Sequence, residues 1–208
     1  MNRVAYINAR LIDPASGWDG PGTLLTEGGL ITDLQLDDAV PDGAEVVDCW
    51  GRVLCPGLID MRVFVGEPGY EYKETISTGV ASAVAGGFTS VCCMPNTNPV
   101  IDSPELIKYL IDKTSSLPIY IYPIGAVTKG QKGRELSEIG LMANAGAIAI
   151  SDDGIPIENS QVLRMALEYS KKFNFPVINH AEDTCLVNHG LVHEGTQSLR
   201  LGLTGNPD

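Results

Sequence analysis

The segment from Pro56 to Gly69 constrains the fold and chemistry of this chain more than any other. Its sequence, PGLIDMRVFVGEPG, is typical of a buried strand that runs into a tight turn rich in glycine and proline. Alternate strand residues point to the same face, so Arg62 and Phe64 share one face. An H-x-H pair at two such positions would aim two imidazole nitrogens at one metal ion, as suits a metal-dependent hydrolase, whereas a guanidinium has no lone pair and a phenyl ring has no ligand atom. The setting indicates an enzyme, but these two side chains predict an inactive one.

From residue 54 onward, apolar segments suited to buried strands alternate with segments suited to helices. A strand recurs about every 30 residues, as in the βα units of a barrel. This alternation predicts a parallel sheet, and therefore an α/β fold of the (β/α) TIM-barrel type with about five strands present. The expected strands are residues 54–59, 89–93, 119–124, 147–150 and 176–178, and the expected helices are residues 75–85, 103–114, 134–145 and 160–173.

The first 53 residues follow a different pattern. Short apolar or alternating runs at residues 4–7, 22–25, 30–34 and 45–48 are separated by Asp-Pro, Gly-Gly and Pro-Asp-Gly turns. Such punctuation predicts short antiparallel strands joined by hairpins. We therefore expect two domains, a small β-domain at residues 1–53 and a partial (β/α) barrel at residues 54–208.

Five strands do not close an eight-stranded barrel. The sequence up to Asp208 is thus expected to be either a fragment of a longer protein or a half-barrel whose open edges need a partner. The residues alone leave both alternatives open.

Composition excludes several classes of partner. The formal charge of −12 argues against nucleic acid and against an anionic membrane surface, because both require a basic patch. No segment has the apolar length of a membrane span or the pattern of a signal peptide, so a cytoplasmic location is expected. The five cysteines form no C-x-x-C pair, which predicts reduced, buried thiols rather than a thiolate metal site.

Four blocks of the sequence carry a family resemblance. They are PGLIDMRVFVGEPGYEYKETISTG, AGGFT with MPNTNP, SDDG, and NHAED, which lie in this order from residue 56 to residue 183. Through these blocks the chain resembles the N-terminal half of the class I bacterial dihydroorotases, in the cyclic amidohydrolase superfamily. The resemblance implies a barrel with a metal, commonly zinc, at the carboxyl ends of its strands, where the metal activates water to open or close a cyclic amide.

The resemblance also assigns positions. The H-x-H metal ligands of the family fall on Arg62 and Phe64, and its carboxylate-binding arginine falls on Gly66, so all three are lost. The substrate-binding asparagine is retained as Asn96. The later ligands are retained as Asp153 and His180, which are therefore expected to be vestigial metal ligands, with no catalytic residue and no cofactor in the chain as it stands.

Each retained residue also has a simpler interpretation. Asp153 follows a strand in a sequence that favours turns, Asn96 suits a cap of its own loop, and His180 suits a histidine bonded to a carboxylate. For Arg62 we expect either exposure at the mouth of the barrel or an ion pair with Asp153 that replaces the charge of the metal.

The resemblance implies two alternative functions, and the fold allows a third. The first is an inactive dihydroorotase-like protein of pyrimidine biosynthesis, with a scaffold or regulatory role beside aspartate carbamoyltransferase, or in a homo-oligomer. The second is an active cyclic amidohydrolase that interconverts dihydroorotate and carbamoyl aspartate at an altered zinc site. The third is a small-molecule binding module that uses Asn96 and the loops at the strand ends.

Overall fold

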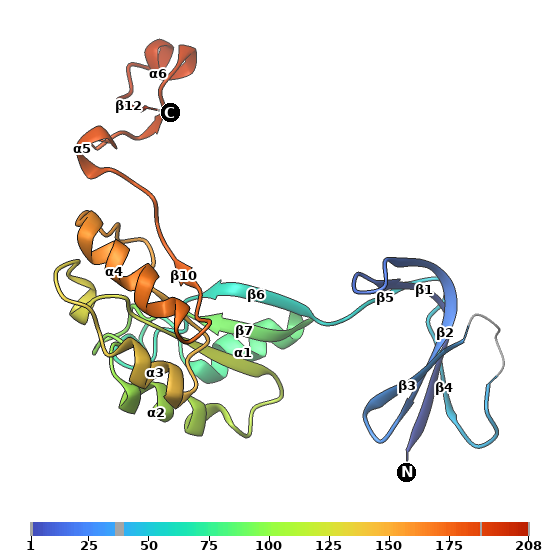
Figure 1. Ribbon diagram of the computed structural model, residues 1–208. Coiled ribbons are helices and arrows are strands. Elements are labelled where there is room, and N and C mark those ends of the chain that lie inside the picture. Colours follow the sequence, from blue (N-terminus) through green and yellow to red (C-terminus); the bar gives the residue numbers. More distant parts are fainter. Residues whose placement is uncertain (1, 36–39, 188, 208) are drawn as a thin grey trace. The chain divides into compact units, whose positions relative to one another are not determined.

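The structure is a computed structural model that describes residues 2–35, 40–187 and 189–207. The chain divides into two compact units, Met1–Gly57 and Leu58–Asp208 (Figure 1). Each unit is described by itself. Within the described residues, no helix has the length and apolar character needed to cross a membrane.

The first unit is a β-sheet in which β1 is central. The strands are β1 (Arg3–Asp13), β2 (Trp18–Glu27), β3 (Leu30–Gln35), β4 (Glu45–Asp48) and β5 (Val53–Leu54). β1, β2 and β3 form the expected antiparallel hairpins. The expectation that β4 would also be antiparallel was wrong, because the chain crosses to the other side of β1 and pairs with it in parallel.

The boundary between the units lies four residues later than residue 53. β5 pairs in parallel with β1, which places Val53 and Leu54 in the first unit. The expected strand at residues 54–59 is therefore split. Cys55, Pro56 and Gly57 separate β5 from β6 (Leu58–Val63), and Pro56 has no N–H to continue a strand ladder.

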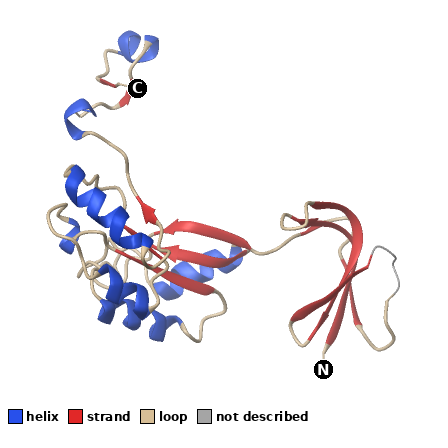
Figure 2. Ribbon diagram, viewed as in Figure 1, coloured by secondary structure: helices blue, strands red, loops and turns tan. Residues whose placement is uncertain are grey.

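The second unit is an α/β structure with a parallel sheet, which confirms the predicted fold class (Figure 2). The sheet runs β10–β9–β8–β7–β6, so every strand lies beside its neighbour in sequence, as in the first part of a barrel. The remaining strands are β7 (Phe88–Cys93), β8 (Tyr120–Gly125), β9 (Ala149–Ser151) and β10 (Val177–Ile178), and the connecting helices are α1 (Ile76–Ala85), α2 (Pro104–Thr114), α3 (Ile139–Ala145) and α4 (Ser160–Lys171). Short elements follow: α5 (Thr184–Val187), β11 (Val192–His193), α6 (Thr196–Leu201) and β12 (Gly205–Asn206).

The core of this unit lies between one face of the sheet and the helices. Ile121 of β8 and Ile150 of β9 pack in one cluster with side chains such as Leu110 of α2 and Met142 of α3. Alternation along β8 places Tyr120 and Tyr122 on the opposite face, where they are 70% and 38% exposed. One face of the sheet is therefore covered by helices, and the other remains partly open to solvent.

One predicted helix is shorter than expected. α3 begins at Ile139 and not at Arg134, because residues 135–137 fold back along residues 126–129. The N–H of Lys129 donates to the carbonyl of Glu135, and Ser137 donates through its N–H to Val127 and through its hydroxyl to Ala126. These bonds hold the segment before α3 in an ordered loop at the carboxyl end of β8.

Candidate functional site

The carboxyl ends of the parallel strands bring three predicted site residues together. Arg62 lies near the end of β6, Asn96 follows β7, and Asp153 follows β9. In parallel α/β sheets this edge is where ligands bind. Three of the four sequence blocks that carry the family resemblance thus meet at one place in the fold.

Asp153 is the centre of this group. The Nε of Arg62 donates to Asp153 Oδ1 at 2.9 Å, and the Nδ2 of Asn96 donates to Asp153 Oδ2 at 2.9 Å. The side chain of Asp153 is 12% exposed, whereas that of Arg62 is 69% exposed. The predicted ion pair between Arg62 and Asp153 is therefore confirmed as a contact, and both carboxylate oxygens of Asp153 accept a hydrogen bond.

The neighbouring Asp152 anchors this turn. Its carboxylate is buried and accepts from the N–H groups of Val127 and Thr128, at 2.8 and 3.1 Å, and from the Thr128 hydroxyl at 2.5 Å. Burial raises the pKa of Asp152, against the opposing effect of the bonds from Thr128 and Val127. Asp153 has a φ of +53° and donates its N–H to Ser151 Oγ at 2.9 Å. The turn is thus fixed on both sides of the peptide bond that joins the two aspartates.

Sequence reasoning assigned no role to Asp152. The only available signal was its place in the Ser-Asp-Asp-Gly block, and adjacent aspartates after a strand are also ordinary turn chemistry. Its three hydrogen bonds to the segment after β8 depend on tertiary contact that spacing does not reveal.

One of the two polar atoms of the Asn96 side-chain amide forms a hydrogen bond, and the other has no partner among the described residues. Its Nδ2 binds Asp153, while its Oδ1 is buried with no hydrogen-bond partner among the described residues. The described structure gives Asn96 no cap on its own loop. Thr97 stabilises the loop instead, because its hydroxyl donates to the carbonyl of Pro99 at 2.7 Å and its N–H donates to that of Pro95 at 2.8 Å. The contact with Asp153 positions Asn96 at the site, and its role toward a substrate stays a prediction.

Phe64 and Gly66 occupy the other lost family positions. The ring of Phe64 lies 6.1 Å from that of Tyr70, in the loop that follows β6. Gly66 has a φ of +67°, and a Cβ at this position would lie 2.5 Å from the carbonyl oxygen of Glu74. An arginine cannot replace Gly66 without a change in this loop.

The loop after β6 is held by a charged pair that the sequence did not single out. Glu67 is 8% exposed; it accepts from the N–H of Ile76 at 2.9 Å and forms an ion pair with Lys113 of α2. Burial opposes ionisation of Glu67, but the bonds from Lys113 and Ile76 prevail and hold its pKa below the usual range. This pair ties the start of α1 to α2.

His180 lies apart from this group in its contacts. Its Nε2 is 2.8 Å from Glu182 Oε2, and its side chain is 44% exposed. No hydrogen bond or ion pair joins it to Arg62, Asn96 or Asp153 within the described parts of the chain. The simpler interpretation, a histidine bonded to a carboxylate, therefore agrees with its contacts.

The described residues at the strand ends do not by themselves supply the ligands of a zinc ion. Among residues 2–35, 40–187 and 189–207, no group of three or more His, Cys, Asp or Glu side chains is placed to hold a metal. The carboxylate of Asp153 is already bound by a guanidinium, which is a donor and not a ligand. A structural or catalytic zinc site needs at least three protein ligands.

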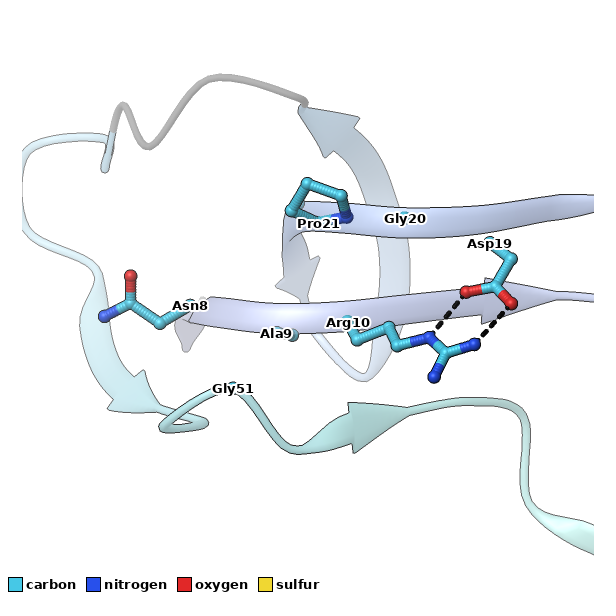
Figure 3. Close-up of a pocket in the computed structure, with 8 residues that line it drawn as sticks. Asn8, Ala9, Arg10, Asp19, Gly20, Pro21 and Gly51 are labelled. Carbon is cyan, nitrogen blue, oxygen red and sulfur yellow. Dashed lines mark hydrogen bonds and ion pairs between the residues drawn. The ribbon is translucent and has the colours of Figure 1, made fainter.

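A hollow in the β-domain offers little chemistry (Figure 3). It has a volume of about 710 Å³, and Gly20, Pro21 and Gly51 are among the residues that line it. Its charged side chains, Arg10 and Asp19, bind each other through two hydrogen bonds of 2.7 Å. Among the described residues that line this hollow, the pair leaves no unpaired acid, base or nucleophile.

Comparisons with known proteins identify the family to which the chain is similar. A family model described as Dihydro-orotase-like matches residues 51–208. The chain is 48% identical over 199 residues to the dihydroorotase of Citrifermentans bemidjiense, and 47% identical over 201 residues to that of Pelobacter propionicus. These matches cover 95% and 96% of this chain but 47% of each relative, so the chain spans about half the length of the curated relatives it matches.

Solved structures show the same fold at lower identity. The L-hydantoinase of Arthrobacter aurescens has a TM-score of 0.77 at 18% identity, and the match covers 91% of this chain and 43% of the hydantoinase. A D-hydantoinase has a TM-score of 0.69 at 19% identity, over 90% of this chain and 42% of that one. With the family model matching most of the sequence, the chain belongs to the dihydro-orotase-like family.

Proposed function

We propose that this chain is a catalytically inactive dihydroorotase-like protein of pyrimidine biosynthesis that serves as a scaffold or regulatory subunit. The observation that carries the proposal is the Nε of Arg62 on the carboxylate of Asp153, at 2.9 Å. In an active metal site, an aspartate at the strand ends gives its oxygens to a cation. Here the guanidinium of Arg62 pairs with the carboxylate of Asp153 in place of a metal ion.

The substitution preserves charge balance while removing the chemistry. An aspartate with a largely buried side chain needs a positive partner, since an unpaired buried charge is costly. Arg62 supplies that charge, but a guanidinium has no lone pair with which to bind a metal ion or to take a proton from a water molecule. The fold around the site is retained although water activation is lost.

A retained fold without water activation suits a subunit that acts through its surface. We propose aspartate carbamoyltransferase as the partner, as the family resemblance suggests. Tight co-purification of the two proteins, co-expressed from the same organism, would support this assignment. Separate elution of both at micromolar concentration would overturn it.

Catalysis is tested by dihydroorotate hydrolysis with zinc supplied, using protein from a host that lacks its own dihydroorotase. We expect no turnover above the buffer blank. The control is Asp153→Ala, which removes the carboxylate at the centre of the site. Turnover that Asp153→Ala abolishes would show an active amidohydrolase with an altered site; turnover that survives it would indicate a contaminant.

A further inference from the structure

A cleft beside the Asp153 turn is lined by a residue whose buried amide donor is unsatisfied. The cleft has a volume of about 440 Å³, and residues 131–134, 155–156 and 158–159 supply most of its lining. Gln131 lines it and is 7% exposed, yet its Nε2 has no hydrogen-bond partner within the described structure. A buried amide donor without an acceptor is destabilising, so an acceptor in the cleft would satisfy a group that the fold leaves unpaired.

The charges beside this donor favour a negative ligand. Lys132 and Arg134 also line the cleft, are exposed, and form no ion pair with any described residue. The adjacent Lys129 is paired with Glu135 and is not available. Glu158 is the one acidic residue in the lining, and it accepts the hydroxyl of Thr184. The cleft is thus locally basic in a chain whose formal charge is −12.

The segment that carries Gln131 is anchored to the buried Asp152 through Thr128. The hydroxyl of Thr128 donates to Asp152 and accepts from the N–H of Gly133 at 2.9 Å. The carbonyl of Thr128 accepts from the N–H of Gln131 at 3.0 Å. The N–H of Gly130 donates to Asp102 at 2.8 Å. These bonds fix the backbone that carries Gln131, so little ordering would be needed on binding.

We propose that this cleft binds the oxyanion of a small organic acid, either a carboxylate or a phosphate ester. The oxyanion accepts from Gln131 Nε2 and pairs with Lys132 and Arg134, while Ile155 and Pro156 offer apolar surface to the carbon skeleton. The site is separate from the Arg62 ion pair and does not require any hydrolytic activity.

The test follows the side-chain amide signals of Gln131 by NMR in the ¹⁵N-labelled chain, assigned by their loss in Gln131→Met. Inorganic phosphate and succinate are titrated separately at constant ionic strength. We expect a saturable shift with at least one of them. Saturation by phosphate alone assigns a phosphate ester, and saturation by succinate alone assigns a carboxylate. No saturable shift with either would overturn the proposal.

The surface variant Lys132→Gln/Arg134→Gln keeps Gln131 and alters only exposed side chains, so folding is not at risk. It should weaken binding by about tenfold or more, since charge-assisted hydrogen bonds are lost. Lys171→Gln removes an exposed cation at the end of α4, outside the cleft, and should leave the affinity within about twofold. Equal affinity in the double variant and in the wild type would also overturn the assignment.

Discussion

Arg62 and Asp153 lie 91 residues apart in sequence, and the guanidinium of one donates to the carboxylate of the other at 2.9 Å. The contact joins the ends of β6 and β9 across the two strands that separate them in the sheet. Asn96, which follows the intervening β7, binds the second oxygen of the same carboxylate. An electrostatic contact therefore connects three strand ends where the family resemblance implies a metal.

The energetic weight of this ion pair should be modest. Arg62 is 69% exposed, so solvent screens the interaction, and a double-mutant cycle with Arg62→Ala and Asp153→Asn should give a coupling of about 0.5–1 kcal/mol. Urea denaturation measures it. The exposed pair Arg164 and Glu168, one helical turn apart in α4, is the control, with about 0.3–0.5 kcal/mol expected. A coupling near zero at low salt would contradict the contact.

Glycine at position 66 should be required by the backbone. Gly66→Ala combines a positive φ with a contact of 2.5 Å to the Glu74 carbonyl, whereas Gly87→Ala has a φ of +79° and no atom within 4 Å. Both substitutions should cost about 1–2 kcal/mol for the left-handed conformation. Gly66→Ala should cost about 1–3 kcal/mol more, because the loop must move. Comparable unfolding midpoints for the two variants would show that the loop adapts.

Asp152 should contribute more to stability than Asp153. Asp152→Ala removes the acceptor of three buried hydrogen bonds and leaves the N–H groups of Val127 and Thr128 unsatisfied. We expect a loss of about 3 kcal/mol in the free energy of unfolding. Asp153→Ala, at a less buried position, should lose about 1 kcal/mol. The reverse order in chemical denaturation would contradict the anchoring role of Asp152.

The exposed cysteines should react with a thiol reagent faster than the buried ones. The expectation that all five are buried was wrong: Cys55 and Cys185 are exposed, while Cys92 and Cys93 are buried in β7. Burial, and then the neighbouring Cys92, raise the pKa of Cys93 to about 12, so its reactive thiolate is scarce at neutral pH. A thiol reagent at pH 8 should label Cys55 and Cys185 rapidly in the native chain, and Cys55→Ser/Cys185→Ser should remove that fast phase. Rapid labelling of Cys93 would contradict its burial.

The sequence was sufficient for the elements that local patterning determines. Apolar runs and glycine stops predicted five parallel strands, although the first of them begins at Leu58 and not at residue 54. Thr75 and Gly146 lie at the ends of helices expected there. Patterning could not predict the start of α3, because residues 135–137 satisfy their backbone through contacts with residues 126–129. It also could not place β4 in parallel with β1, since the crossover depends on sheet order.

The part of the candidate site that the sequence predicted is the ion pair between Arg62 and Asp153. A largely buried Asp153 without a metal needs a cation, and Arg62 was the residue that strand alternation placed at the same edge. The anchoring by Asp152 and the unsatisfied Gln131 were not predictable, because burial and missing hydrogen bonds become visible only in three dimensions.

The pair of Glu67 and Lys113 should make stability depend on acid pH. The pKa of Glu67 is lower in the folded chain than its ordinary value of 4.5, because the bonds from Lys113 and Ile76 outweigh the opposing effect of burial. The folded state therefore holds the proton less tightly than the unfolded state. The contribution of the Glu67 carboxylate to stability is complete above pH 4.5, and it is lost as the pH falls through the pKa that Glu67 has in the folded chain.

Glu67→Gln removes this titration and should reduce the free energy of unfolding by about 2 kcal/mol at pH 7, because two hydrogen bonds lose their charge. Its difference from the wild type should shrink as the pH falls below 4.5, as followed by urea denaturation across pH 3.5–7. Glu135→Gln, which breaks the exposed pair with Lys129, is the matched control and should cost less than about 1 kcal/mol. A difference between wild type and Glu67→Gln that stays constant across this range would show that Glu67 stabilises the loop without its charge.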